Sequence, residues 1–281
     1  MSNRQRYPSD LTDLQWENIE HLFPQARGKV GRPRTYPLRE IVNAVLYLAR
    51  GGCTWRMLPH DFPPWKTVSY YFYTWRDTGV WEQVHAALRA EIRAVAGRER
   101  TPSAGVIDSQ SVKTTESGGP KGYDSGKKIA GRKRHLLVDT LGLVWALAVL
   151  PADVQDRDGA KRLFARLPDL PRLAVVWADG AYQSLIDWVR QTFGWALTTV
   201  LRPVGVKGYV HLPKRWIVER TIGWFGRYRR LAKDYEHNPA SSEAWIYIAM
   251  THRMSRLMVP ARDRDNRLHR RRRRRSHPLR R

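Results

Sequence analysis

Three acidic side chains stand at positions where a carboxylate has few ordinary roles. Asp108 ends the apolar run 104–107, Asp179 follows the apolar run 173–178, and Glu219 lies in a helical pattern with strongly basic other faces. A carboxylate that closes a buried strand costs free energy unless it is paired, caps a helix or binds a ligand. Attack on a phosphodiester by water or a hydroxyl uses two divalent cations about 4 Å apart, and hard cations take oxygen ligands. The three acids are therefore candidate ligands of a metal-dependent phosphodiester site.

Each acid also has a structural alternative. Asp179 precedes Gly180, Ala181 and a helical pattern, so it is a candidate N-cap. Glu219 is spaced to pair with Arg215 one helical turn earlier. Asp108 has the weakest alternative, because no helix follows it. A fourth acid, Asp139, precedes a Thr-Leu-Gly turn, which favours turn capping over metal binding.

The elements that must position these acids begin near residue 101. Short apolar runs predict strands over 104–108, 135–139, 143–150, 173–177 and 196–201. Helical spacing is found over 158–167, 182–192, 215–231 and 241–258. This order predicts an α/β domain, residues 101–260, with a mixed five-stranded sheet and flanking helices. The Gly-, Lys- and Ser-rich segment 116–132 is either a mobile basic loop or an extension of the hairpin.

Residues 1–96 have a different pattern, with short helices separated by Pro and Gly. The spacing predicts helices over 10–24, 37–50, 63–78 and 80–95, typical of an all-α domain of the helix-turn-helix type. The helix after Pro64 is the candidate DNA-contacting helix, through Lys66, Ser69, Tyr70 and Arg76. An ordinary amphipathic helix with a solvated polar side explains it equally well. Arg32 and Arg34 flank a proline in an extended segment, which suits either a DNA minor groove or a basic linker.

The charge of the chain indicates a large acidic partner. Its 281 residues include 50 Lys+Arg and 26 Asp+Glu, for a net charge of +24 and a pI near 10.8. Residues 261–281 hold eleven arginines and two aspartates, and we expect a disordered Arg-rich tail, either attracting DNA or serving as an accessory extension. The remaining charge predicts polyanion binding by the folded part.

Compartment and membrane predictions come from cysteine and hydropathy. The single cysteine excludes an intramolecular disulfide framework and fits a reducing compartment. The longest apolar run, residues 143–150, is far shorter than the about 20 residues of a membrane span. We therefore expect a cytoplasmic protein with no membrane segment.

Several ordered blocks carry a family resemblance. Residues 106–113, 131–139, 178–182 and 215–220, with the leading segments 11–24 and 51–56, resemble bacterial insertion-sequence transposases of the DDE type, in the IS5-like branch of the IS4/IS5 group. The resemblance covers residues 7 to 258. It implies an RNase H-like catalytic core that cleaves element ends and transfers the strand to target DNA. It also implies two Mg²⁺ ions, with Mn²⁺ as a substitute, held by Asp108, Asp179 and Glu219.

The same resemblance implies further DNA contacts and partners. The family signature Tyr-x2-Arg-x3-Glu-x6-Lys is matched at Arg215 and Glu219, but Leu212 and Gly226 stand at the Tyr and Lys positions. The candidate phosphate contacts are Lys113, Arg215, Arg227, Arg229 and Arg230. The implied partners are double-stranded DNA, as terminal repeats and target, and a second copy in a homodimer or larger synaptic complex. The implied location is the bacterial cytoplasm, at the nucleoid.

Two functions of different classes fit these observations. The first is an active transposase, favoured by the intact Asp-Asp-Glu set. The second is a DNA-binding repressor or decayed transposase. The glycine at the lysine position of the family signature is compatible with this second function. A plain nuclease with the same core is a third and weaker interpretation.

Overall fold

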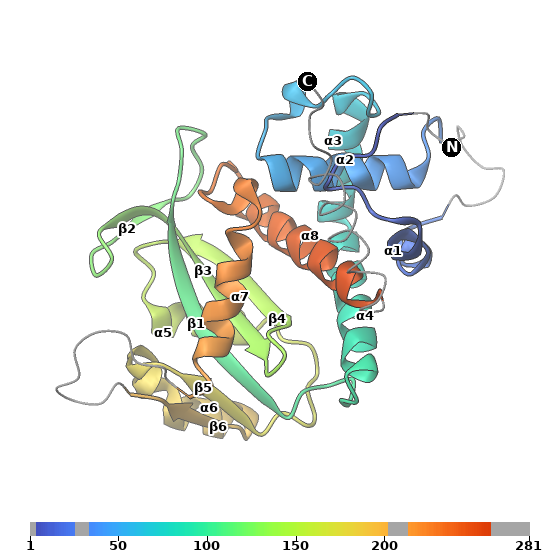
Figure 1. The fold of residues 1–281 in the computed structure, drawn as a ribbon. Helices are drawn as coiled ribbons and strands as arrows, with labels where there is room; N and C mark the ends of the chain where they lie inside the picture. The colour runs from blue at the N-terminus through green and yellow to red at the C-terminus, as the bar shows by residue number, and fades with distance from the viewer. Residues whose placement is uncertain (1–3, 26–33, 202–212, 260–281) are drawn as a thin grey trace, which may run out of the picture.

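The computed structural model describes residues 4–25, 34–201 and 213–259. They form a curled mixed sheet covered by helices, preceded in the chain by a group of helices (Figure 1). This confirms the predicted α/β class with an RNase H-like sheet after a helical region. Arg32, Leu212 and the tail 261–281 lie outside the described residues.

The sheet has six strands where the sequence predicted five. Strand β1 (Ala104–Lys113) pairs antiparallel with β3 (Ile129–Asp139), which also pairs with β4 (Val144–Pro151). On its other side β1 pairs in parallel with β5 (Val175–Ala178), and β6 (Ala196–Thr199) extends the sheet. The additional strand is β2 (Gly122–Asp124), which pairs with the start of β3. Segment 116–132 is therefore in part an extension of the hairpin, the second of the two alternatives.

β1 and β3 are both longer than predicted, and β3 is so because charged residues are buried in it. Arg132, Lys133 and Arg134 of β3 all lie in the interior. Nη1 of Arg132 donates to Oδ1 of Asp234 at 3.1 Å, and Nη1 of Arg134 donates to the carbonyl of Leu231 at 2.9 Å. These partners lie about a hundred residues along the chain, so the local pattern could not decide between a loop and an extension of the hairpin.

Alternate strand residues face two apolar layers. Ile107 packs with α5 (Asp156–Phe164) and α6 (Ile186–Phe193) on one face of the sheet. Val106 faces the layer that contains α7 (Trp216–Phe225) and α8 (Pro239–Leu257). A strand buried on both faces reads as a continuous apolar run, as in this sequence.

The N-terminal helices are α1 (Asp13–Glu17), α2 (Leu38–Gly51), α3 (Trp65–Asp77) and α4 (Val80–Val95). The helix predicted over 10–24 is interrupted: α1 ends at Glu17 and a 3₁₀ turn follows at Glu20–Leu22. α2 ends at Gly52, whose φ of 75° is the left-handed cap conformation that glycine adopts easily.

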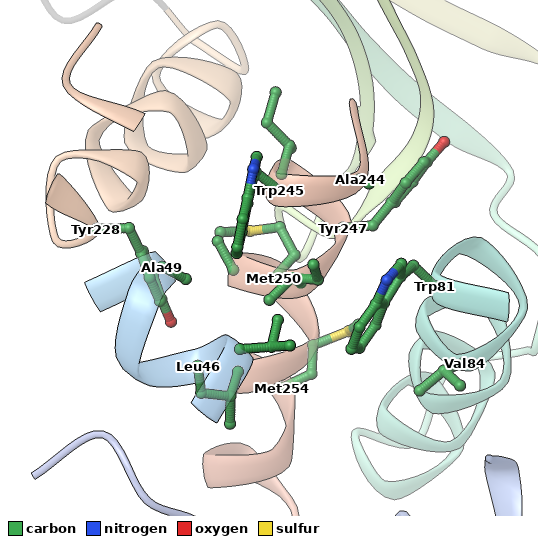
Figure 2. Packing of buried hydrophobic residues seen from close by; sticks show 14 of the residues in the cluster. Leu46, Ala49, Trp81, Val84, Tyr228, Ala244, Trp245, Tyr247, Met250 and Met254 are labelled. Atoms are coloured by element: carbon green, nitrogen blue, oxygen red, sulfur yellow. The ribbon is translucent and has the colours of Figure 1, made fainter. Parts of the chain in front are cut away.

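α8 carries the second apolar layer into the N-terminal helices. Figure 2 shows Trp245, Met250 and Met254 of α8 among side chains of α2 and α4, including Leu46, Ala49, Trp81 and Val84. The ring of Trp245 stacks on Phe72 of α3 with centroids 4.5 Å apart. One continuous core thus joins the region before residue 96 to the region after 101. The functional division at that point stays a prediction.

Candidate active site

Asp108 and Asp179 occupy equivalent places on two neighbouring strands. β1 and β5 run in parallel, with Val106 beside Trp177. Each acid comes two residues after this pair, so the register, carried forward, places Asp108 beside Asp179. Neighbouring strands lie about 4.8 Å apart. The two carboxylates therefore meet where β5 ends.

The Asp179 side chain also caps a 3₁₀ helix, as its structural alternative predicted. Its Oδ1 accepts a hydrogen bond from the Ala181 N–H at 2.9 Å, at the start of the 3₁₀ segment Gly180–Leu185. Its Oδ2 lies 3.9 Å from Nη2 of Arg215. Capping fixes the side chain through one oxygen and leaves the other facing the site.

Glu219 reaches the same place from α7, which contacts β1 and β3. Its Oε1 lies 3.8 Å from Nη2 of Arg215, the nitrogen that also faces Asp179. The predicted pair between Arg215 and Glu219 is present, but it is shared with a second carboxylate. One guanidinium nitrogen therefore lies near Asp179 and Glu219 together.

Asp108 is the electrostatically perturbed member of the group. Burial raises the pKa of Asp108 to about 6, the N–H of Ser109 lowers it, and the neighbouring Asp179 raises it. Smaller lowering effects come from Arg215 and Lys127, which places both cations close to this carboxylate. A buried acid beside a second acid is stabilised when a cation binds between them.

The donor set fits a hard divalent cation, since it consists of carboxylates with no thiol. Within residues 4–25, 34–201 and 213–259, however, no three such side chains converge closely enough to form a metal cluster. The position between Asp179 and Glu219 belongs to the Arg215 guanidinium in this structure.

Asp139 is excluded from this group by its own partners. It is fully buried and accepts hydrogen bonds from the N–H groups of Leu141 and Leu143 and from Nε1 of Trp145. It also forms an ion pair with Arg93 of α4. The turn-capping interpretation of Asp139 is confirmed, and the acid additionally ties the sheet to the N-terminal helices.

Two residues near the acids carried no sequence signal. Asp156, at the start of α5, accepts a hydrogen bond from Oγ of Ser109 at 2.8 Å. Lys127, in the turn between β2 and β3, donates from Nζ to the carbonyl of Ser109 at 3.2 Å. Lys127 belongs to the segment that the sequence left open as a loop or a hairpin. Only the strand pairing that folds this segment back over β1 reveals its place.

The candidate DNA-contacting residues in the N-terminal region differ in their exposure to solvent. Lys66 and Tyr70 are exposed, whereas Ser69 is buried and its Oγ donates to the carbonyl of Lys66. Ser69 is therefore wrongly placed on the outer face by helical spacing. Arg76 is half-buried and donates to Oγ of Ser241 on α8, and Arg34 donates to the carbonyl of Pro24.

The candidate phosphate-contacting residues near the acids also differ in their exposure to solvent. Lys113, Arg227 and Arg229 are exposed. Arg230 is buried, pairs with Glu236 at 2.6 Å and donates to the carbonyl of Cys53 at 2.9 Å. The structure therefore contradicts Arg230 as a free phosphate contact, because its guanidinium links the segment after α7 to the N-terminal region.

Two known protein families match this chain, one in the N-terminal helical region and one in the region that contains the sheet. A family described as a putative transposase of the IS4/5 family matches residues 11–85. A family described as a transposase DDE domain matches residues 99–254, more than half of the chain.

Two relatives are shorter proteins similar to parts of this chain. An uncharacterized protein, y4sN, of Sinorhizobium fredii is 38% identical over 82 residues, which are 29% of this chain and 64% of the relative. An uncharacterized 16.2 kDa protein of insertion element IS402 from Burkholderia cepacia is 26% identical over 113 residues, 38% of this chain and 76% of the relative. The chain thus covers somewhat less than two thirds of the first relative. Among the described helices, none is long and apolar enough to cross a membrane.

Proposed function

Because this chain belongs to the DDE transposases of insertion sequences, we propose that it cuts DNA at the ends of its element and joins the freed 3′-OH to target DNA. The observation that carries the proposal is that Arg215 lies between two of the acids while strand register brings the third beside them, although the three carboxylates do not converge into a closed cluster in this structure. Asp108 and Asp179 are neighbours on parallel strands, and Glu219 shares one Arg215 nitrogen with Asp179.

The three carboxylates would hold two divalent cations, Mg²⁺ or Mn²⁺, as ligands and not as general bases. When bound, such ions activate the attacking oxygen and stabilise the leaving oxygen of a phosphodiester. Arg215 supports the proposal from the protein side, since its Nη2 lies 3.9 Å from Asp179 and 3.8 Å from Glu219. A planar guanidinium at this place would be suited to bind a DNA phosphate through two hydrogen bonds.

DNA recognition is assigned to the region before residue 96. The exposed side chains of Lys66 and Tyr70 on α3 support a groove contact. Residues 101–260 then act as the catalytic domain. Because two element ends must be cut and joined together, we propose a homodimer or larger complex as the working form.

The test is a cleavage and joining assay on a labelled duplex that carries the element end, with Mg²⁺ present. Asp108→Ala, Asp179→Ala and Glu219→Ala should each abolish nicking and joining, because each removes a metal ligand. Binding of the same duplex should stay close to that of the parental protein, since phosphate affinity comes mainly from Lys and Arg. Asp187→Ala is the matched control, an exposed acid on α6 outside the group.

The outcomes separate the candidate functions. A parental protein that binds ends tightly but never nicks them would favour the repressor or decayed transposase. Nicking without joining would favour a plain nuclease. Parental cleavage by any one of the three variants would remove that residue from the catalytic set.

A further inference from the structure

The turn between β2 and β3 brings a lysine to the edge of the carboxylate group. Residues 125–128 connect the two strands, and side chains of this hairpin contact β1 at Ser109 and Ser111. Lys127, within this turn, is exposed, yet its Nζ lies 3.2 Å from the carbonyl oxygen of Ser109. Ser109 directly follows Asp108, so the ammonium group lies beside the proposed metal-binding acid.

The turn is held in place by a buried acid. Oδ1 of Asp124 accepts a hydrogen bond from the backbone N–H of Lys127 at 3.0 Å. Its other oxygen accepts from Oγ of Ser111 on β1 and lies 3.6 Å from Nζ of Lys133. The turn is therefore fixed to the strand that carries Asp108, and the position of Lys127 is set before any ligand arrives.

Lys127 has more hydrogen-bond donors than are needed to fasten the turn to the Ser109 carbonyl. An ammonium group has three donor protons, and one bond to the Ser109 carbonyl leaves two for another acceptor. The side chain is exposed to solvent, so these two protons are accessible to a ligand.

We propose that Lys127 binds a backbone phosphate of the DNA strand being cut and holds that strand against Asp108. The inference rests on the proposed function, because it concerns the same site. The competing interpretation is structural: Lys127 fastens the turn to β1 and does not touch DNA.

Two substitutions separate charge from anchoring. Lys127→Gln keeps a donor for the Ser109 carbonyl but removes the charge, whereas Lys127→Arg keeps the charge. Lys128→Gln, at the next residue of the same turn, is the matched control. Each variant is assayed for cleavage at saturating end DNA, for affinity over a series of salt concentrations, and for thermal unfolding.

We expect Lys127→Gln to lower the cleavage rate at saturating DNA by about a hundredfold, the scale of losing one donor to a reacting phosphate. The slope of log K against log salt should fall by about 0.9, the value for one phosphate contact. Lys127→Arg should recover most of the rate, and Lys128→Gln should behave as the parental protein. The thermal midpoint should not change in any variant.

A Lys127→Gln protein with the parental rate and the parental salt slope would overturn the proposal. So would an arginine variant as slow as the glutamine variant, because charge would then not be what matters. If the parental protein binds ends without cutting them, the proposed function fails. The salt slope of Lys127→Gln against Lys128→Gln still decides the phosphate contact in that case.

Discussion

Replacing Gly159 by alanine should destabilise this protein, although the same change inside a helix is normally favourable. Gly159 lies in α5, directly against the imidazole ring of His135 on β3. A β-carbon at residue 159 would lie 2.1 Å from Cε1 and 2.3 Å from Nε2 of His135. The ring is fully buried, with Ser109 and Ala148 as its neighbours on the adjacent strands. Either α5 or the ring must therefore shift.

The magnitude follows from two opposing effects. Overpacking a closed core costs about 1–3 kcal/mol, and alanine regains about 0.5–1 kcal/mol of the backbone entropy that glycine loses in a helix. The net expectation is a loss between about 0 and about 2.5 kcal/mol in the free energy of unfolding, in the upper part of this range because a 2.1 Å contact forces a shift. Urea titration measures it. Gly223→Ala in α7 is the control: its β-carbon would meet nothing within 4 Å, and the variant should gain stability.

The reasoning would be refuted by a Gly159→Ala protein as stable as the parental one. A double variant with His135→Ala tests the cause, because removing the ring makes room for the new methyl group. The two changes should then show a coupling energy of about 0.5–3 kcal/mol. Additive losses would mean that the ring contact is not the source of the strain.

Three further predictions concern charged groups. Asp139→Ala should lower the free energy of unfolding by about 3–5 kcal/mol, because Arg93 stays buried without its carboxylate; a variant of parental stability that no longer cuts DNA would return Asp139 to the catalytic candidates. Arg230→Ala should destabilise the fold and leave the salt dependence of DNA binding unchanged. Arg227→Ala should leave stability unchanged and lower the slope of log K against log salt by about 0.9. The reverse pattern in urea and binding titrations would contradict both assignments. Burial lowers the pKa of His135 from 6.5 to about 4, so the unfolded chain takes up this proton first as the pH falls. Stability should therefore decrease from pH 6.5 down to 4 by about 3 kcal/mol, and His135→Leu should lack that part of the decrease in urea titrations across this range.

The sequence predicts this fold best where local pattern and tertiary structure agree. The strands that end near Asp108 and Asp179 are apolar runs, and their parallel pairing then brings both acids together. The prediction stays open where distant residues compensate a local cost, as at Arg132, whose burial depends on Asp234. Ser69 was misplaced for a related reason, because burial of one side of a helix depends on which neighbours cover it.

The placement of Lys127 and Arg215 could not be predicted from the sequence. Both lie in stretches where basic residues are frequent, so composition does not distinguish them. Lys127 reaches the Ser109 carbonyl because β2 pairs with β3, a pairing of three residues with little hydrophobic signal. Arg215 is spaced to pair with Glu219, but its second contact, with Asp179, depends on how α7 lies across the sheet.

The position of α8 has a consequence for how the protein is made. Residues 239–257 complete the apolar core of helices that the ribosome releases first. Until they emerge, Trp81 and Val84 of α4 lack the covering side chains of Met250 and Met254 (Figure 2). A nascent chain or an early-terminated product thus exposes this apolar surface and is prone to aggregate. The DNA recognition proposed for the N-terminal helices would then become available only when the chain that carries all three acids has been synthesised.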